Sequence, residues 1–196
     1  LLDGGAALVQ LDEPVLSEVV FSGPKSKRSF MCGALSESLG PEHELGFAGD
    51  LVNAVVDGLP RERIALHVCG GNWTPDEGVA LAGSYAPLVE TLASMKVGAY
   101  LLEMCTPRAG DMDLLRDLPD DARIGVGVVN QKHTETEAIK DVAAKIQQAI
   151  ELFGRERVLL HPDCGFATFA DNPICSAALA EEKLAVIARA AATFMR

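Results

Sequence analysis

The stretch RIALHVCGGN, residues 63–72, contains a short and mostly apolar run, Ile64–Val68, which is followed by cysteine, two glycines and asparagine. A nearly continuous apolar run of this length is typical of a strand buried on both faces of a parallel sheet. Because side chains alternate along a strand, we expect His67 and Cys69 to point to the same side at its carboxyl end.

Further runs of the same kind flank this stretch, at Ala7–Leu11, Ala99–Leu102, Ile124–Val129 and Val158–Leu160. Between them lie stretches with helical spacing of apolar residues. The expected inner faces are Leu51, Val52, Val55 and Val56; then Ile139, Val142, Ala143, Ile146 and Ile150; and finally Leu179, Leu184, Ile187 and Ala191. Thr134 and Glu137 precede the second of these stretches with the spacing of a capping box. Strands that alternate with helices predict an α/β fold with a parallel sheet.

Two architectures fit this alternation, a doubly wound open sheet and a closed barrel. No glycine-rich phosphate loop follows the first strand, as would be typical of a nucleotide-binding open sheet. Polar residues instead follow every predicted strand, which is typical of the TIM barrel. A complete barrel has eight strand–helix units in about 250 residues, whereas these 196 residues hold five. We therefore predict the C-terminal five units of a TIM-type (β/α) barrel and treat residues 1–196 as one partial barrel domain.

The charge balance excludes some classes of partner. The chain has 17 Lys and Arg against 28 Asp and Glu, a formal net charge of −11. A protein that binds nucleic acid or an anionic membrane surface needs a basic face, so we expect neither as a partner.

Lys25, Lys27 and Arg28 fall in an irregular segment, Ser22–Pro41, that we interpret as a candidate active-site loop. No apolar run is long enough to span a bilayer and no leader precedes the first strand, which predicts a cytoplasmic protein.

The five cysteines are an odd number, which does not fit a disulfide scaffold. We interpret Cys32 and Cys175 as non-ligands. If the strand ends converge, His67, Cys69, Glu103 and Cys164 can surround one metal, and nitrogen and sulfur donors are those that zinc prefers. Alternation places Cys105 on the strand face of Glu103, so on spacing alone Cys105 is a rival ligand.

Five motifs in order resemble the catalytic domain of cobalamin-independent methionine synthase. They are Val9-Gln-Leu-Asp-Glu-Pro14, the H-x-C tripeptide with Gly70-Gly71-Asn72, the strand ending at Glu103, Ile124-Gly-Val-Gly-Val128 and Pro162-Asp-Cys-Gly165. The chain is most similar to the shorter methionine-synthase-like proteins, with Arg108-Ala-Gly-Asp111 and Cys164-Gly-Phe-Ala-Thr168.

The resemblance implies a zinc-dependent methyltransferase that acts on a small thiol, homocysteine, to give methionine. It also implies that the first barrel strands are missing from this chain. It identifies as zinc ligands His67, Cys69, Glu103 and Cys164. It assigns Asp12 to the amino group of homocysteine and Glu18 to the pterin of a folate donor.

One position departs from the pattern. Where the long enzymes carry a histidine that protonates the leaving group, the best-aligned position here is Lys132, and His133 follows it. His133 is thus the candidate catalytic residue, and the methyl donor is either a methylfolate or a methylcorrinoid.

Three alternatives stay open at this point. The first is alkyl transfer to another thiol, such as the opening of an epoxide by coenzyme M. The second is a truncated or degenerate barrel without catalytic activity. The third, uroporphyrinogen-decarboxylase-like chemistry, needs a basic pocket, to which Arg108, Arg123 and Lys132 would contribute little.

Overall fold

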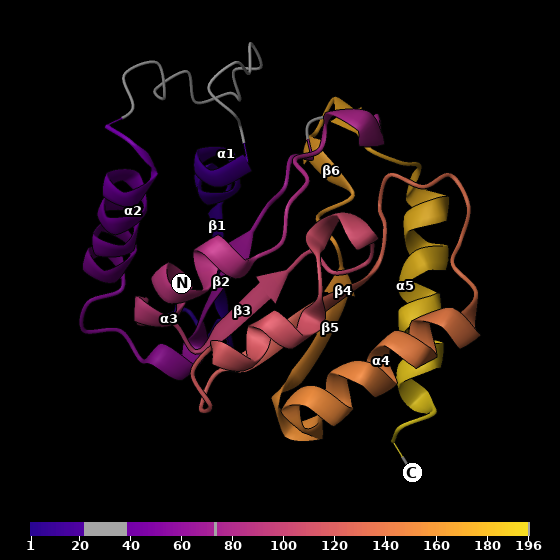
Figure 1. Ribbon diagram of the computed structural model, residues 1–196. Helices are drawn as coiled ribbons and strands as arrows, with labels where there is room; N and C mark the ends of the chain where they lie inside the picture. Colours follow the sequence, from indigo (N-terminus) through magenta and orange to yellow (C-terminus); the bar gives the residue numbers. More distant parts are fainter. Residues whose placement is uncertain (22–38, 73, 196) are drawn as a thin grey trace.

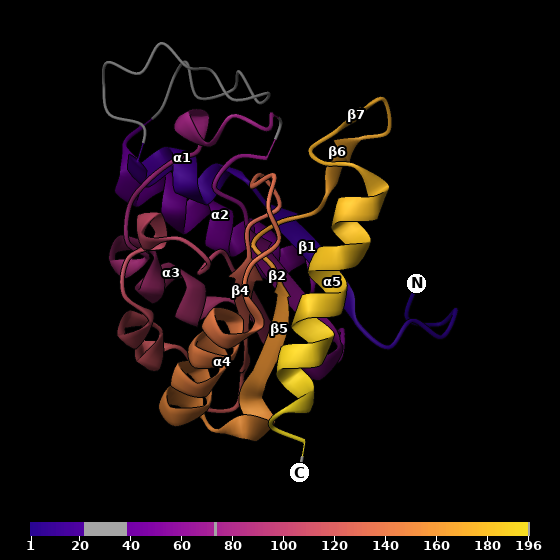
Figure 2. The same ribbon diagram turned by 90° about the vertical axis from the view of Figure 1, so that its right-hand side faces the viewer.

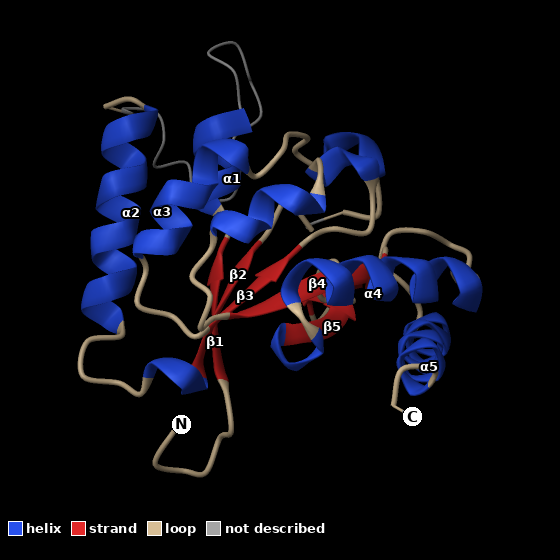
Figure 3. Cartoon of the chain, turned by 60° about the horizontal axis from the view of Figure 1, so that its bottom comes forward, coloured by secondary structure: helices blue, strands red, loops and turns tan. Residues whose placement is uncertain are grey.

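The computed structural model of the chain describes residues 1–21, 39–72 and 74–195. Most of the predicted loop Ser22–Pro41, with Lys25, Lys27, Arg28 and Cys32, lies outside the described residues. The main sheet has five parallel strands in chain order (Figures 1 and 3). These are β1 (Val9–Glu13), β2 (Ile64–Val68), β3 (Ala99–Leu102), β4 (Arg123–Val129) and β5 (Val158–Pro162).

The α-helices are α1 (Val15–Phe21), α2 (Pro41–Val55), α3 (Val89–Ser94), α4 (Ile139–Phe153) and α5 (Ala177–Ala192). Short 3₁₀ turns occur at Arg61–Arg63, Glu77–Val79, Ala86–Leu88, Pro107–Ala109, Met112–Asp117 and Arg155–Arg157. A two-stranded antiparallel hairpin, β6 (Ala167–Phe169) and β7 (Asn172–Pro173), lies between β5 and α5 (Figure 2). Within the described residues, no helix combines the length and the apolarity needed to cross a membrane.

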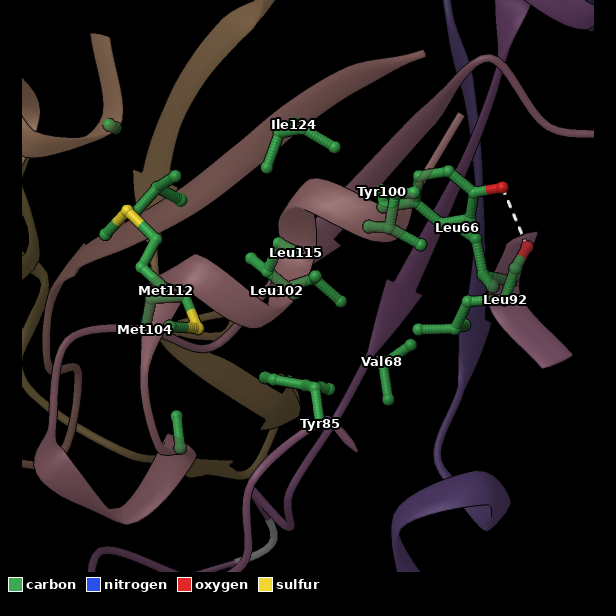
Figure 4. Packing of buried hydrophobic residues seen from close by; sticks show 14 of the residues in the cluster. Leu66, Val68, Tyr85, Leu92, Tyr100, Leu102, Met104, Met112, Leu115 and Ile124 are labelled. Atoms are coloured by element: carbon green, nitrogen blue, oxygen red, sulfur yellow. Dashed lines mark hydrogen bonds between the residues drawn. The ribbon is translucent and has the colours of Figure 1, made fainter. Parts of the chain in front are cut away.

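The two faces of the sheet have different roles. Leu66 and Tyr100 are fully buried in the core between sheet and helices, and the Tyr100 hydroxyl donates a 2.8 Å hydrogen bond to the carbonyl of Leu92 on α3 (Figure 4). His67 and Leu101, one residue further along each strand, line a cavity on the opposite face. Strand alternation therefore separates the apolar core from the face that lines the cavity.

The strand register places the candidate site residues at one edge of the sheet. Asp12 pairs with His67, and His67 pairs with Leu101 on the next strand. Gly127 pairs with His161 between β4 and β5. Because all five strands are parallel, their carboxyl ends lie at the same edge, as the sequence predicts.

Several predicted details were wrong. Strand β1 begins two residues later than expected and continues to Glu13. On α2, Val52 is buried, but Leu51 and Val55 of the predicted inner face are exposed. On α5, Leu184 is 50% exposed, and the buried residues of that helix are Lys183, Val186, Ile187 and Ala190.

The predicted capping box does not form. The N-cap of α4 is Ala138, with no side-chain hydrogen bond. Glu137 instead accepts hydrogen bonds from the backbone N–H of Asn130, at 2.8 Å, and from Lys183 Nζ, at 2.9 Å. These partners lie in other parts of the fold and satisfy both carboxylate oxygens, so none is left to cap the helix.

Candidate metal centre

The four predicted metal ligands lie together at the carboxyl ends of the strands. His67 is the fourth residue of β2, Cys69 and Glu103 directly follow β2 and β3, and Cys164 follows β5 by two residues. One ligand atom from each of these side chains lies within 4.8 Å of the others. His67 and Glu103 are buried, and both thiols are half-buried.

The separation of the two sulfurs fits a tetrahedral metal ion. The sulfurs of Cys69 and Cys164 are 3.7 Å apart, far beyond the disulfide bond length of about 2.05 Å. Two sulfurs that each lie about 2.3 Å from one tetrahedral zinc are separated by about 3.8 Å. His67 Nδ1 lies 2.9 Å from the carbonyl oxygen of Leu101. This contact favours the tautomer with the proton on Nδ1, so the lone pair of Nε2 is available to a metal ion.

The electrostatics of the cluster favour a cation. The hydrogen bond with Cys164 lowers the pKa of the Cys69 thiol to about 4, and His67 contributes in the same direction, although burial opposes the shift. The same hydrogen bond, together with burial, raises the pKa of the Cys164 thiol. Burial alone would lower the pKa of His67, but Cys69, the Leu101 carbonyl and the charge of Glu103 together outweigh burial and raise it. Burial, then the negative charges of Cys69 and Asp163, raise the pKa of Glu103 to about 8. A cation at the centre would relieve this repulsion among buried acids.

The Glu103 carboxylate has two partners that spacing alone did not indicate. The backbone N–H of Gly70 donates to Oε1 at 2.8 Å, and Arg108 Nη2 donates to Oε2 at 3.0 Å. The backbone N–H of Glu103 itself donates to the hydroxyl of Tyr85 at 3.0 Å. Arg108 begins the Arg-Ala-Gly-Asp motif, which was the signal in the sequence that pointed to it.

A second residue outside the predictions, Asp163, shapes the chain next to the cluster. Its Oδ1 accepts the backbone N–H groups of Met104, at 2.9 Å, and Cys105, at 2.7 Å. Burial raises the pKa of Asp163 to about 6. Asp163 packs against Gly127, where any β-carbon would collide with the carboxylate. Its position between Pro162 and Cys164 in the Pro-Asp-Cys-Gly motif was the available signal.

Cys105, the rival ligand on spacing, is not part of the cluster. It lines a separate hollow, about 490 Å³ in volume, together with Met104 and Lys145. Burial, then the nearby charge of Asp163, raise the pKa of Cys105 to about 12. A thiol in this state is a poor nucleophile and a poor ligand.

A cavity of about 520 Å³ opens beside the cluster. Its walls are Gln10, Asp12, Pro14, His67, Cys69, Asn72, Leu101, His161, Pro162, Cys164, Gly165, Ala167 and Thr168. Asp12 is exposed to the cavity, and its Oδ1 accepts a 2.6 Å hydrogen bond from Gln10 Nε2. Glu18 is buried on α1, and His133 is exposed after β4. Among the described residues, neither of these two side chains lines the cavity.

The chain is similar in sequence to curated proteins from other organisms. The chain is 29% identical over 145 residues to 2-hydroxypropyl-CoM lyase of Xanthobacter autotrophicus. This match covers 61% of this chain and 39% of that protein. The chain is also 22% identical over 165 residues to a methionine synthase of Saccharolobus solfataricus. This match covers 84% of this chain and 39% of that protein. The chain thus spans about two fifths of the length of these curated relatives.

A solved structure supports the fold. A B12-independent methionine synthase from Shewanella sp. W3-18-1, in complex with selenomethionine, superposes with a TM-score of 0.71 at 16% identity. The match covers 98% of this chain and 50% of that chain. The prediction of a TIM-type α/β fold is confirmed. Residues 1–186 match the family described as the catalytic domain of cobalamin-independent synthase. The chain therefore belongs to the cobalamin-independent methionine synthase catalytic-domain family.

Proposed function

We propose that this protein is a zinc-dependent methyltransferase that transfers a methyl group to a small thiol, homocysteine, to give methionine. One observation carries the proposal: the ligand atoms of His67, Cys69, Glu103 and Cys164 lie within 4.8 Å of one another beside an open cavity. We further propose that residues 1–196 act as one partial barrel domain and that the protein is cytoplasmic.

The donor set favours thiol chemistry over hydrolysis. His67, Cys69, Glu103 and Cys164 would hold the zinc, which when bound keeps an incoming thiol deprotonated at neutral pH. Two thiolates and one carboxylate contribute three negative charges against the two positive charges of zinc. An electron-rich set of this kind favours a nucleophilic sulfur and disfavours a strongly acidic zinc-bound water. A free thiol, with a pKa of about 8.5, would be mostly protonated at the same pH.

The proposal gives roles to three further residues, of which Asp12 alone lines the cavity. Asp12 would hold the ammonium group of homocysteine, a role supported by its position in the cavity wall beside His67. In the transfer, the substrate sulfur donates a lone pair to the methyl carbon, and the donor leaves with the electrons of its bond to that carbon. In this proposal Glu18 contacts the pterin of a methylfolate and His133 protonates the folate leaving group. A methylcorrinoid donor needs neither residue.

The charge of the cavity favours an amino thiol over a sulfonate thiol. Its lining, in the part of the chain that the structure describes, includes the carboxylate of Asp12 and no lysine or arginine. Asp12 can pair with the ammonium group of homocysteine, whereas coenzyme M carries a sulfonate and no ammonium group, so Asp12 would repel it. This difference supports homocysteine over the thiol named for the Xanthobacter relative.

The test combines metal content with product analysis. We expect one zinc per chain in the wild type, and methionine from homocysteine with methylfolate or a methylcorrinoid. Cys164→Ser should lose both zinc and product, while the matched variant Cys105→Ser keeps both. A folded wild type without zinc would contradict the proposal and favour a non-catalytic barrel. Zinc equally retained in Cys164→Ser would remove Cys164 from the metal site. Turnover of coenzyme M with an epoxide, without any methionine from homocysteine, would overturn the choice of substrate.

A further inference from the structure

Arg108 lies among three carboxylates next to the candidate metal centre. Its side chain is 13% exposed. The guanidinium lies 3.0 Å from Glu103 Oε2, 3.5 Å from Glu77 Oε1 and 3.9 Å from Asp163 Oδ2. A guanidinium presents five N–H donors in a rigid plane, so it can hold several acidic groups in fixed directions.

The contacts to Glu103 fix the rotation of its carboxylate. Gly70 N–H donates to Oε1 and Arg108 Nη2 donates to Oε2, from two different loops. A carboxylate held at one oxygen can still rotate about its last torsion, which has a broad energy minimum. A second donor on the other oxygen removes this freedom. The two contacts together therefore set the direction in which the remaining lone pairs point.

Gly70 leaves the space that this arrangement needs. A β-carbon at position 70 would lie 2.8 Å from Glu103 Oε2 and 3.2 Å from Arg108 Nη1. The first distance is below any ordinary contact, so a larger residue would displace the carboxylate or the guanidinium. The Arg108–Glu103 pair thus packs directly against the backbone that follows Cys69.

The backbone around Arg108 is itself anchored. Its carbonyl accepts the N–H of Gly83 at 3.1 Å, and its Nη1 donates to the carbonyl of Leu81 at 3.4 Å. The N–H of Leu81 in turn donates to the carbonyl of Gly70 at 2.8 Å. These bonds link the segment after β3 to the segment after β2, which carries Cys69.

We propose that Arg108 is a positioning residue that holds the Glu103 carboxylate in the orientation required for metal binding. This inference rests on the zinc site of the proposed function. Loss of a hydrogen-bonding partner of a metal ligand weakens metal binding by about 10- to 100-fold. We expect a loss of this size in Arg108→Gln. Arg108→Lys keeps the charge but loses the planar fork, and we expect it to recover only part of the affinity.

The experiment measures zinc dissociation constants by competition with a chelator, and the visible absorption of the Co²⁺-loaded protein, which reports the ligands and geometry around the metal. The variants are Arg108→Gln, Arg108→Lys and Gly70→Ala. The control is Arg116→Gln, because Arg116 is 57% exposed and pairs with Asp113 on the surface. Circular dichroism establishes that each variant is folded.

We expect weaker zinc binding and an altered Co²⁺ spectrum in Arg108→Gln and Gly70→Ala, with both unchanged in Arg116→Gln. If Arg108→Gln does not fold, the zinc dissociation constants and Co²⁺ spectra of Gly70→Ala and Arg108→Lys test the role of Arg108 instead. Wild-type affinity and spectrum in the folded Arg108 and Gly70 variants would overturn the role of Arg108 but leave the proposed function intact. A wild type that binds neither Zn²⁺ nor Co²⁺ would overturn both.

Discussion

The sulfur atoms of Cys69 and Cys164 lie 3.7 Å apart, although 95 positions separate the two residues in the chain. The hydrogen bond between the two thiols lowers the pKa of Cys69 and raises the pKa of Cys164, so Cys69 is the first of the pair to ionise. Gly71 N–H donates to the same sulfur at 3.3 Å. Of the two thiols, Cys69 is therefore the one whose thiolate form is favoured.

That thiolate gives alkylation of Cys69 a distinctive pH dependence. Thiolates react with iodoacetamide and thiols do not, and a pKa of about 4 leaves the Cys69 thiol almost fully ionised by pH 6. In metal-free protein the rate at Cys69 should stay flat between pH 6 and pH 8.5. The rate at Cys105, whose pKa is about 12, should be far lower and rise with pH across the same range.

Mass spectrometry of the alkylated peptides measures both rates. Zinc should protect Cys69 and leave Cys105 unaffected. A Cys69 rate that climbs about tenfold per pH unit between pH 6 and pH 8 would show an ordinary thiol and contradict this description.

Asp12→Asn should keep zinc and weaken the binding of homocysteine. Asp12 lines the cavity but is not one of the four clustered ligands. A hydrogen bond to a charged group contributes about 1.5–3 kcal/mol, so the KM for homocysteine should rise about 10- to 100-fold.

Steady-state kinetics and elemental analysis test this prediction. Asp50→Asn, at an exposed position on α2, is the matched control. An unchanged KM in Asp12→Asn would remove Asp12 from the substrate site, and loss of zinc would place it in the metal site.

Lys183→Met should destabilise the fold strongly. Lys183 is fully buried, and its Nζ donates to Glu137 Oε2 at 2.9 Å and to the carbonyl of Glu135 at 2.7 Å. Removing one partner of a buried ion pair costs about 3–5 kcal/mol, because the other charge stays buried.

Lys96→Met is the control, because Lys96 pairs with Asp57 at 3.8 Å on the surface, and such a pair contributes about 0–1 kcal/mol. Urea unfolding measures both variants. Equal, small losses of unfolding free energy would mean that the Lys183–Glu137 pair does not stabilise the fold.

Two leucine substitutions test the assignment of the core. Leu92 is fully buried on α3, and Leu184 is 50% exposed on α5. Leu92→Ala should lower the free energy of unfolding by about 2–5 kcal/mol. Leu184→Ala should change it by no more than about 0.5 kcal/mol. Thermal unfolding of the two variants gives the comparison, and a larger loss in Leu184→Ala would restore the face predicted from the sequence.

Much of the fold follows from local patterns in the sequence. Each of the five main-sheet strands was predicted within two residues of its observed bounds, because a short run rich in β-branched apolar residues favours a strand buried on both faces of a parallel sheet. Strand alternation also placed His67 and Cys69 on the same side, and the order of motifs identified the family.

The buried faces of the helices did not follow from the sequence. Lys183 is buried and Leu184 exposed on α5, the reverse of what hydropathy predicts. The reason is the partner: Glu137, 46 positions earlier, satisfies the ammonium group in the interior. Helical periodicity contains no information about such a distant contact.

The sequence by itself determined which residue types end each strand, since alternation and apolar runs are local properties. Spacing left Glu103 and Cys105 as rivals, the family resemblance favoured Glu103, and only the tertiary structure shows why Glu103 is the one in the cluster. Beyond Leu102 the strand ends, and the hydrogen bonds from Met104 and Cys105 to Asp163 turn the chain so that Glu103 joins the cluster and Cys105 does not. The orientation of the Glu103 carboxylate likewise depends on Gly70 and Arg108. These contacts join separate strand ends, so they exist only once the parallel sheet has brought those ends to one edge.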